Sequence, residues 1–458
     1  MPAAIVAGLL EHAQLDVGLD GLVLTGAEPV LPSSFRVDAA AQAAIAAAGL
    51  AAAEMWRRRT GRAQGVAVDM RAAAAEFRSE RHVRLDGAPP GESWDAIAGV
   101  YRTADGWVRL HTNFPHHRAG VVRLLGCADT REAVAAALAT RRAEAFETEA
   151  TEAGMCVAAL RDFAAWDAHP HGQWLRGVPP LRIERIGDAP PRGFAPDPAR
   201  PLSGVRVLEL TRVIAGPVAG RTLAAHGADV LHITGPGVPN MDVLLPDTNR
   251  GKRPAELDLR AAAGAARLRE LVGGADVFLQ SYRHGALAGL GFGAGAVTAL
   301  RPGIVHATLS AYGEDGPWGG KRGFDSLVQV ATGFNAAEAD AAGSATPRAL
   351  PCQALDHASG YLLALGTMAA LLRRAEEGGS WQVRVSLAGT GNWLRSLGRL
   401  PLGLAAADPG QAEVADLLEE SDSEYGRMQA VRHAAVLSET PAHWALPARR
   451  AGSSPAAW

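Results

Sequence analysis

Between residues 203 and 335, short apolar runs alternate with helical segments, and this alternation constrains the fold more than any other feature of the chain. Gly and Pro breaks and an alanine-rich stretch follow the first run, and a helical segment at 261–272 precedes a later one. Strands that alternate with helices predict a parallel sheet flanked by helices, so we expect an α/β fold here. The expected strands lie at 205–210, 228–234, 253–259, 276–282 and 304–313.

The rest of the chain has a different texture. Because 458 residues exceed what one hydrophobic core usually supports, two or more domains are expected. Residues 87–150 contain an Asp105-Gly106 turn between two alternating runs, followed by charged helices, which predicts a small α+β module. Residues 177–203 are rich in proline and predict a linker or an extended crossing segment.

Charge and cysteine content exclude several classes of partner. The formal net charge of −3 offers no electrostatic argument for binding nucleic acid or an anionic membrane. The three cysteines lie far apart without a CxxC pair, and the histidines have no HExxH spacing, so neither a disulfide framework nor a metal site is predicted. The first twenty residues lack a basic region, and the alanine-rich stretch 39–53 is too short to span a bilayer, so we expect a cytoplasmic protein.

Asp356 stands directly before a long apolar stretch, LLALGTMAALL at 362–372, which predicts a buried helix. An aspartate at this place is explained by helix capping, worth about 1 kcal/mol. The same geometry holds a carboxylate rigid and partly exposed, as a nucleophile requires. From the residues alone, both interpretations stay open.

Cations and glycines mark the predicted strand ends. The segments TNRGKR (248–253) and SYRHG (281–285) place Lys and Arg beside Gly in loops, where they suit either phosphate groups or a solvated surface. The first strand, turn and helix lack GxGxxG, which disfavours a dinucleotide enzyme. Gly216 and Gly220 there allow a close approach of a ligand or simply of the sheet.

An internal similarity links two distant segments. Residues 37–70 superimpose on 355–387 at an offset of 318: an acid, an alanine-rich helix with a basic end, a turn, a glutamine and an alternating strand recur. Asp38 thereby matches Asp356. Most of the identities are alanines, so the repeat is weak by itself.

The succession of motifs resembles the family III CoA-transferases, the group that includes formyl-CoA transferase and the carnitine CoA-transferases. The motifs are PLSGVRVLELTRVIAGPVAGRTLAAHGADVLHI, NRGKRPAELDLR, GGADVFLQSYRHGALAGLGFG, PGIVHATLSAYGEDGPW and ALDHASG, over about 201–390. Residues 37–177 resemble the C-terminal half of that family. The halves therefore stand in permuted order, with the segment around the aspartate duplicated.

The resemblance implies the fold and the division of the chain. It implies a large domain with a Rossmann-like parallel sheet, a smaller α+β domain, and an interlocked assembly that makes a homodimer the candidate state. The expected parts are 1–86, resembling the part of the large domain that follows the aspartate; 87–150, the small domain; 151–200, a return segment and linker; 201–395, the CoA-binding part; and 396–458, a tail without an assigned role.

The resemblance also implies a chemistry. Asp356 would attack an acyl-CoA thioester, form an aspartyl anhydride and then an aspartyl-CoA thioester, and pass CoA to a carboxylic acid, with no metal or redox cofactor. The CoA substrate would lie over one set of residues, with Tyr312 nearer the acyl end. That set is Val213, Ala215, Lys252, Arg253, Tyr282 and Arg283.

Some positions depart from the family pattern and keep alternatives open. Gly289 stands where an arginine is frequent, and Asp38 is followed by Gln42 where Asp356 is followed by Gly360, so we expect Asp38 to cap its helix. A racemase of the same superfamily would need a histidine where this chain has Phe324, and His357 is no evident substitute because neighbouring helix residues point apart. A non-catalytic CoA-binding relative is the third alternative.

Overall fold

A seven-stranded sheet forms the centre of the molecule in the computed structural model, which describes residues 2–458. Its strand order is β10-β9-β8-β11-β12-β13-β7, and all neighbours are parallel except the β13/β7 pair. The parallel part has the standard order of a doubly wound sheet, so the predicted α/β alternation is confirmed. The strands are β8 (Arg206–Leu210), β9 (Asp229–Thr234), β10 (Lys252–Glu256), β11 (Val277–Gln280), β12 (Val305–Ser310), β13 (Ser380–Ser386) and β7 (Leu181–Gly187).

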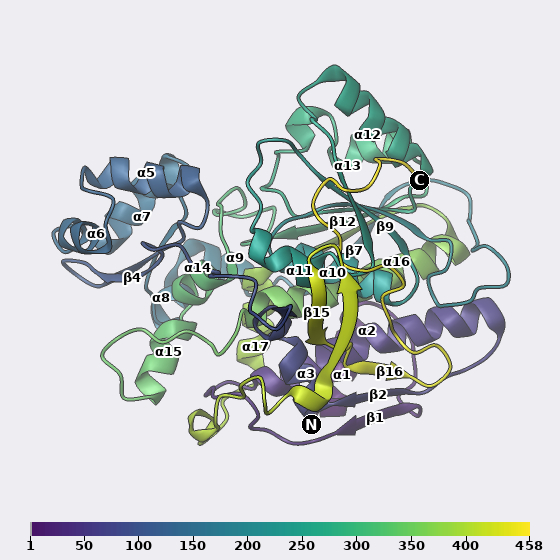
Figure 1. Cartoon of the computed structure of the whole chain (residues 1–458), viewed down its shortest axis with the longest axis horizontal. Helices are drawn as coiled ribbons and strands as arrows, with labels where there is room; N and C mark the ends of the chain where they lie inside the picture. Colours follow the sequence, from purple (N-terminus) through teal and green to yellow (C-terminus); the bar gives the residue numbers. More distant parts are fainter. Residues whose placement is uncertain (1) are drawn as a thin grey trace.

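Helices cover both faces of this sheet (Figure 1). Alternate side chains of each strand enter two separate apolar clusters: Val207 and Val230 belong to one cluster, and Leu208 and Leu231 to the other. This burial on both faces explains why the strands are continuous apolar runs rather than alternating ones. One face carries α10 (Ala215–Ala225) and α16 (Ala354–Glu377), and α2 (Val37–Thr60) packs on α16 as a further layer; the other face carries α12 (Ala262–Gly274) and α13 (Ala294–Leu300).

The two repeated segments form similar elements that pack against each other. Both α2 and α16 have 24 residues and are almost entirely buried, and Arg58 near the end of α2 pairs with Glu376 near the end of α16. Both are long and apolar enough to cross a membrane by composition, but their most apolar windows lie wholly inside the protein. After α16 the chain enters the central sheet. After α2 it forms β2 (Val66–Asp69), in a separate sheet with β1 (Leu22–Thr25) and β16 (Ala435–Leu437).

The small domain lies at one end of the molecule (Figure 1) and has its own apolar cluster. The predicted hairpin is confirmed, because β4 (Gly99–Arg102) and β5 (Trp107–Leu110) pair around the Asp105-Gly106 turn. A third strand, β6 (Val157–Ala159), completes the sheet. Its helices are α5 (Pro115–Leu125), α6 (Arg131–Leu138) and α7 (Ala143–Glu152), and α8 (Phe163–Ala168) and α9 (Pro170–Leu175) lead back.

The proline-rich stretch 177–203 is more than the linker that its composition indicated. Residues 181–187 form β7, which pairs antiparallel with β13 at the edge of the central sheet. The prolines flank this strand on both sides, so they masked the alternation of LRIERIG. The segment is a strand because it pairs with β13, and amino-acid composition does not show which distant segment a stretch of chain pairs with.

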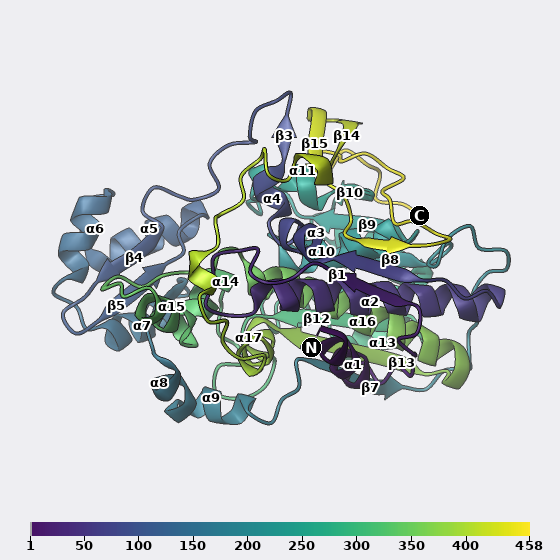
Figure 2. The same ribbon diagram turned by 90° about the horizontal axis from the view of Figure 1, so that it is seen from below.

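The tail 396–458 is an integral part of the structure. Its strands β14 (Leu418–Ser423) and β15 (Gly426–Val431) form a sheet with β3 (Arg84–Leu85), and β16 joins β2 (Figure 2). The tail therefore binds segments from the beginning of the chain. The remaining helices are α1 (Pro2–His12), α3 (Met70–Glu76), α4 (Ser79–His82), α11 (Leu245–Thr248), α14 (Asp325–Ala331), α15 (Phe334–Ala341) and α17 (Leu387–Ser396).

Candidate active site

A cleft of about 700 Å³ opens where the parallel strands end. The loops after β8, β9, β10, β11 and β12 line it, together with the small-domain segment 114–117. Ligands of open α/β sheets bind in this position, outside the carboxyl ends of the strands. The fold therefore places a candidate site between the sheet and the small domain.

The cleft is strongly cationic. Asp356 is the one carboxylate among its lining residues, against five cations from the described part of the chain. Arg260 and Arg283 are exposed and make no ion pair within residues 2–458. This balance suits a ligand with several negative charges. The five cations are Arg212, Arg260, Arg283, Lys321 and Arg322.

Four of the residues expected to contact CoA line this cleft: Val213, Ala215, Tyr282 and Arg283. Val213 has φ of 70°, a left-handed conformation that is strained for a β-branched side chain and costs about 1–3 kcal/mol. Such strain tends to occur at functional sites. Burial raises the pKa of Tyr282, so its phenol is a neutral hydrogen-bonding group. A role of these four residues in binding CoA stays a prediction.

Lys252, Arg253 and Tyr312 do not line this cleft, and their contact with CoA stays a prediction. Lys252 is fully buried, and its Nζ donates to Glu209 Oε1 at 2.8 Å and to the Pro217 carbonyl. Arg253 forms a two-pronged pair with Asp229. Tyr312 is buried against Trp318, with ring centroids 5.0 Å apart. Pairing and packing within the protein use these three side chains, and sequence proximity to strand ends could not reveal this.

Arg212, Lys321 and Arg322 are cleft residues that the sequence analysis missed. Arg212 directly precedes Val213 in the turn after β8, so its neighbour in sequence was a usable signal. Lys321 pairs with Glu147 of the small domain at 2.7 Å, and Arg322 donates to the Gly154 carbonyl. These contacts join the small domain to the large one at the cleft.

Asp356 does not cap its helix, so the capping interpretation is excluded, and its role as a nucleophile stays a prediction. The helix α16 begins at Ala354 with Gln353 at the cap position, so Asp356 is its third residue. Within residues 2–458 no group donates a hydrogen bond to its carboxylate, which is only 7% exposed and lines the cleft. An uncapped carboxylate at the edge of a cavity is free to react with a ligand.

Asp356 lies beside a second buried acid, Asp325, at the start of α14. The backbone N–H of Asp356 donates to Asp325 Oδ2 at 2.9 Å. Burial, then the charges of Asp325 and Glu80, hold the pKa of Asp356 well above its ordinary value. Burial also raises the pKa of Asp325, to about 6, although amide hydrogen bonds offset part of the effect. Proximity of like charges inside a protein separates the titrations of such a pair.

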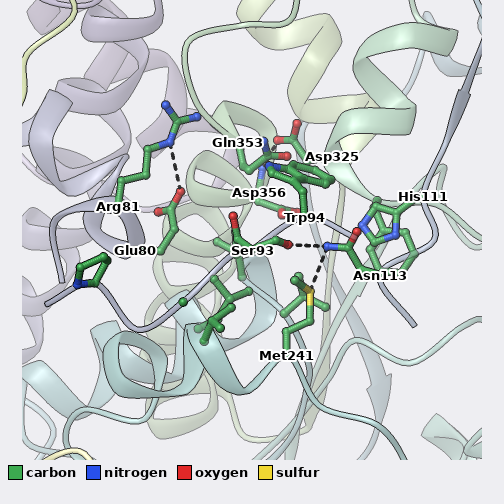
Figure 3. Close-up of a pocket in the computed structure, with 17 residues that line it drawn as sticks. Glu80, Arg81, Ser93, Trp94, His111, Asn113, Met241, Asp325, Gln353 and Asp356 are labelled. Atoms are coloured by element: carbon green, nitrogen blue, oxygen red, sulfur yellow. Dashed lines mark hydrogen bonds and ion pairs between the residues drawn. The ribbon is translucent and has the colours of Figure 1, made fainter. Parts of the chain in front are cut away.

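A second, smaller cavity of about 150 Å³ adjoins the cleft at Asp356, and Figure 3 shows the residues that line it. Four residues border both spaces: Val213, Ile214, Phe324 and Asp356. The carboxylate therefore stands at the junction between the cationic cleft and this smaller cavity. A ligand that occupies both spaces would place the bonds that join its two parts next to Asp356.

Two histidines are close to this junction. His111 lies face to face with Phe324, with ring centroids 3.7 Å apart, and lines the small cavity. Burial, and then the charge of Arg109, lowers the pKa of His111 to about 3, so it is a neutral imidazole. His357 turns instead toward Glu80, with Nε2 3.0 Å from Oε2. The expectation that His357 does not share the site of Asp356 agrees with this geometry.

Asp38, the counterpart of Asp356 in α2, is closed off. Its carboxylate accepts hydrogen bonds from the N–H groups of Val30 at 2.7 Å and Leu31 at 3.2 Å. It is 2% exposed and borders neither the cleft nor the small cavity. These amides come from the loop before the helix rather than from the helix itself, so Asp38 holds that loop and does not cap α2.

No group of three or more His, Cys, Asp or Glu side chains within residues 2–458 is arranged to hold a metal ion.

Comparison with known proteins gives a consistent family signal. The family model described as CoA-transferase family III matches residues 13–185 and 202–398. The chain is 31% identical to the acetyl-coenzyme A transferase nodX of Hypoxylon pulicicidum over 329 residues, which are 66% of this chain and 55% of that protein. It is 35% identical to the succinate–glutarate CoA-transferase of Agrobacterium fabrum, over 30% of this chain and 39% of that protein.

A solved relative covers a smaller part of the chain. The probable fatty acyl-CoA transferase Rv3272 of Mycobacterium tuberculosis is 34% identical over 42% of this chain and 51% of its own length. Its crystal structure aligns with 44% of this chain and 57% of that chain at a TM-score of 0.41. The chain thus spans about half the length of the curated relatives that it matches.

Proposed function

The chain belongs to CoA-transferase family III, and we propose that it moves coenzyme A from an acyl-CoA donor to a carboxylic acid acceptor. One observation carries this proposal: the unpaired carboxylate of Asp356 stands where a cationic cleft meets a small cavity. The cleft suits the phosphates of CoA and the cavity suits an acyl group. The names of relatives as CoA-transferases support the same activity.

In the proposed mechanism, a carboxylate oxygen of Asp356 attacks the thioester carbonyl. The C–S bond breaks, CoA leaves as a thiolate, and an aspartyl anhydride remains. The thiolate then attacks the aspartyl carbonyl of the anhydride, which releases the first acid and leaves an aspartyl-CoA thioester. The acceptor carboxylate attacks this thioester, which expels the CoA thiolate and forms a second anhydride. The thiolate then attacks the acceptor's carbonyl in that anhydride, which releases Asp356 as a carboxylate and yields the new acyl-CoA. Covalent catalysis divides one difficult exchange into easier steps.

Replacing Asp356 tests the proposal directly. Incubation of the protein with an acyl-CoA and trapping with hydroxylamine or borohydride should label Asp356, as read by peptide mass spectrometry. Asp356→Asn should remove the label and lower transfer at least about 10³-fold, since the nucleophile is lost. Transfer that continues undiminished in Asp356→Asn would exclude this mechanism.

A racemase is the second candidate, and His111 is the observation that favours it. Phe324 occupies the place where racemases carry a histidine, but His111 from the small domain stacks on Phe324 and borders the same cavity as Asp356. A neutral imidazole and a carboxyl group on opposite sides of an α-carbon form an acid–base pair. Exchange of deuterium at the α-carbon of an acyl-CoA, without transfer to any acid, would support the racemase.

A non-catalytic relative would bind CoA and form no adduct, so the same trapping experiment separates it from both enzymes. We also propose a cytoplasmic homodimer, to be checked by light scattering and by localisation of the tagged protein.

A further inference from the structure

The small cavity beside Asp356 differs in chemistry from the cationic cleft. About half of its 17 lining residues are apolar, and these come from the large domain, the small domain and the loops between them. Trp94, Met241, Leu244 and Phe324 are the largest of them. Figure 3 shows the polar residues Ser93, Asn113 and Gln353 among those that line the same space.

The ionisable groups of the cavity are mainly acidic. Three carboxyl groups border it, those of Glu80, Asp325 and Asp356, against the single guanidinium of Arg81. Arg81 is 41% exposed, and its Nε lies 3.8 Å from Glu80 Oε1, so much of its charge is shared with Glu80 and with solvent. A second carboxylate inside this space would therefore meet the negative charge of Glu80 and find no free cation.

Glu80 is the fixed charge of this set. Burial would raise the pKa of Glu80, but the hydrogen bond from His357 and its charge outweigh burial and hold the pKa below its ordinary value. The same hydrogen bond, 3.0 Å from His357 Nε2, orients the carboxylate. Glu80 therefore remains negative at the pH at which Asp356 must act.

The volume of the cavity bounds the length of its occupant. It measures about 150 Å³, and a cavity of that size in another protein holds one benzene molecule, about six non-hydrogen atoms. A long fatty chain does not fit without opening the wall formed by Met241 and Leu244.

We propose that this cavity selects short, uncharged acyl groups, so that donor and acceptor are monocarboxylic acids with a tail of up to about six non-hydrogen atoms. The inference rests on the proposed function, because it takes Asp356 as the point where the acyl group is bonded. It excludes dicarboxylic acids as good substrates. Glu80 is the residue that disfavours them, and Met241 sets the length limit.

Binding of unreactive thioethers tests the cavity without requiring catalysis. S-pentyl-CoA and S-carboxypropyl-CoA differ mainly in the terminal carboxylate, and calorimetry with the intact protein measures both. S-pentyl-CoA should bind about 100-fold more tightly, since an unpaired carboxylate would be buried beside Glu80. Equal affinities, or tighter binding of the carboxylate form, would overturn the proposal even if transfer is observed.

A series of acceptor acids tests the same point in turnover. With the wild-type protein, kcat/KM should rise about fourfold per methylene from acetate to about hexanoate and then fall. Succinate and glutarate should be at least about 100-fold poorer than pentanoate. If no acid accepts CoA and Asp356 is not labelled, the proposed function fails; the thioether measurement still decides what the cavity binds.

Two variants assign the selection to named residues. Glu80→Gln should lower the ratio of kcat/KM for pentanoate to kcat/KM for glutarate about tenfold or more. Met241→Trp should move the acid with the highest kcat/KM to a shorter chain, and glutarate should remain a poor acceptor. The matched controls are Glu270→Gln on α12 and Val23→Trp on β1, both exposed and outside the cavities. If this ratio of kcat/KM values is unchanged in Glu80→Gln, Glu80 is not the residue that disfavours dicarboxylic acids.

Discussion

At the residue scale, the environment of Asp356 has two opposing effects. A buried carboxylate close to Asp325 and Glu80 is costly to ionise, which raises its pKa. The same burial removes the water that would otherwise solvate the nucleophile and hydrolyse an anhydride. Since attack requires the ionised form, activity should increase with pH until Asp356 is deprotonated.

The neighbour Asp325 should tune this pH dependence. Asp325→Asn removes a negative charge beside Asp356 while its side-chain oxygen can still accept the Asp356 N–H. The acidic limb of the kcat/KM profile should therefore shift to lower pH, as measured by initial rates of transfer across the pH range. The remote Glu270→Gln should leave the limb in place. A shift to higher pH would contradict the assigned repulsion.

Asp38 should affect stability and not activity. Burial raises its pKa from 3.8 to about 6, so the folded state binds the proton more tightly than the unfolded state does. This stabilisation is present below pH 4 and is lost as the pH rises to about 6, which costs about 3 kcal/mol. Urea unfolding at pH 4 and 7 measures this effect. From pH 4 to pH 7, the free energy of unfolding of Asp38→Asn should decrease by that amount less than the free energy of unfolding of the wild type.

The Asp38→Asn protein should also transfer CoA at the wild-type rate, because Asp38 borders neither cavity. A loss of transfer in a folded Asp38→Asn protein would show that the second aspartate has a catalytic part.

At the element scale, the close packing of α10 on α16 determines where Asp356 lies. A Cβ at Gly360 would lie 2.7 Å from the Ala215 carbonyl oxygen and 2.7 Å from Val218 Cβ. Glycine is therefore required for this helix contact. A Cβ at Gly220 would likewise collide with the side chain of Glu209, so close packing explains this glycine.

Gly360→Ala should force the two helices apart. Overpacking of this kind costs about 1–3 kcal/mol and should also lower kcat, since the start of α16 moves with Asp356. Urea unfolding and transfer rates measure the two effects. Gly289→Ala is the control: its added methyl meets no atom within 4 Å, so its stability should stay near that of the wild type.

At the scale of the whole molecule, a buried charge cluster holds three distant segments together. Arg221 of α10 pairs with Asp247 at 2.5 Å and lies 4.0 Å from Glu76 of α3. Arg250 stacks on Trp444 of the tail, 3.6 Å from its ring centre. The tail therefore covers charges that would otherwise be partly exposed.

Trp444→Ala should weaken this junction. The indole N–H donates to the Arg221 carbonyl at 3.0 Å, and its ring packs on Gly251. Loss of a large packed side chain costs about 3 kcal/mol, to be read from denaturant unfolding. The exposed neighbour His443→Ala should change stability by no more than about 0.5 kcal/mol. Equal effects of the two substitutions would show that the tail does not stabilise the cluster.

The sequence by itself determined the parallel sheet, the hairpin of the small domain, the buried helix after Asp356 and the family. These follow from local patterns: apolar periodicity, turn residues and the order of motifs. It also identified Asp356 and four residues that line the cleft.

Only the tertiary structure decided how each polar group is used. Lys252 faces Glu209 because β10 and β8 place them on the same face of the sheet, and 43 residues of sequence separate them. His111 reaches Phe324, and the amides of Val30 and Leu31 close off Asp38, through contacts that no short window contains. A charge interacts most strongly with the groups that lie within a few ångströms. In a folded chain, these groups are set by distance in space and not by distance along the sequence.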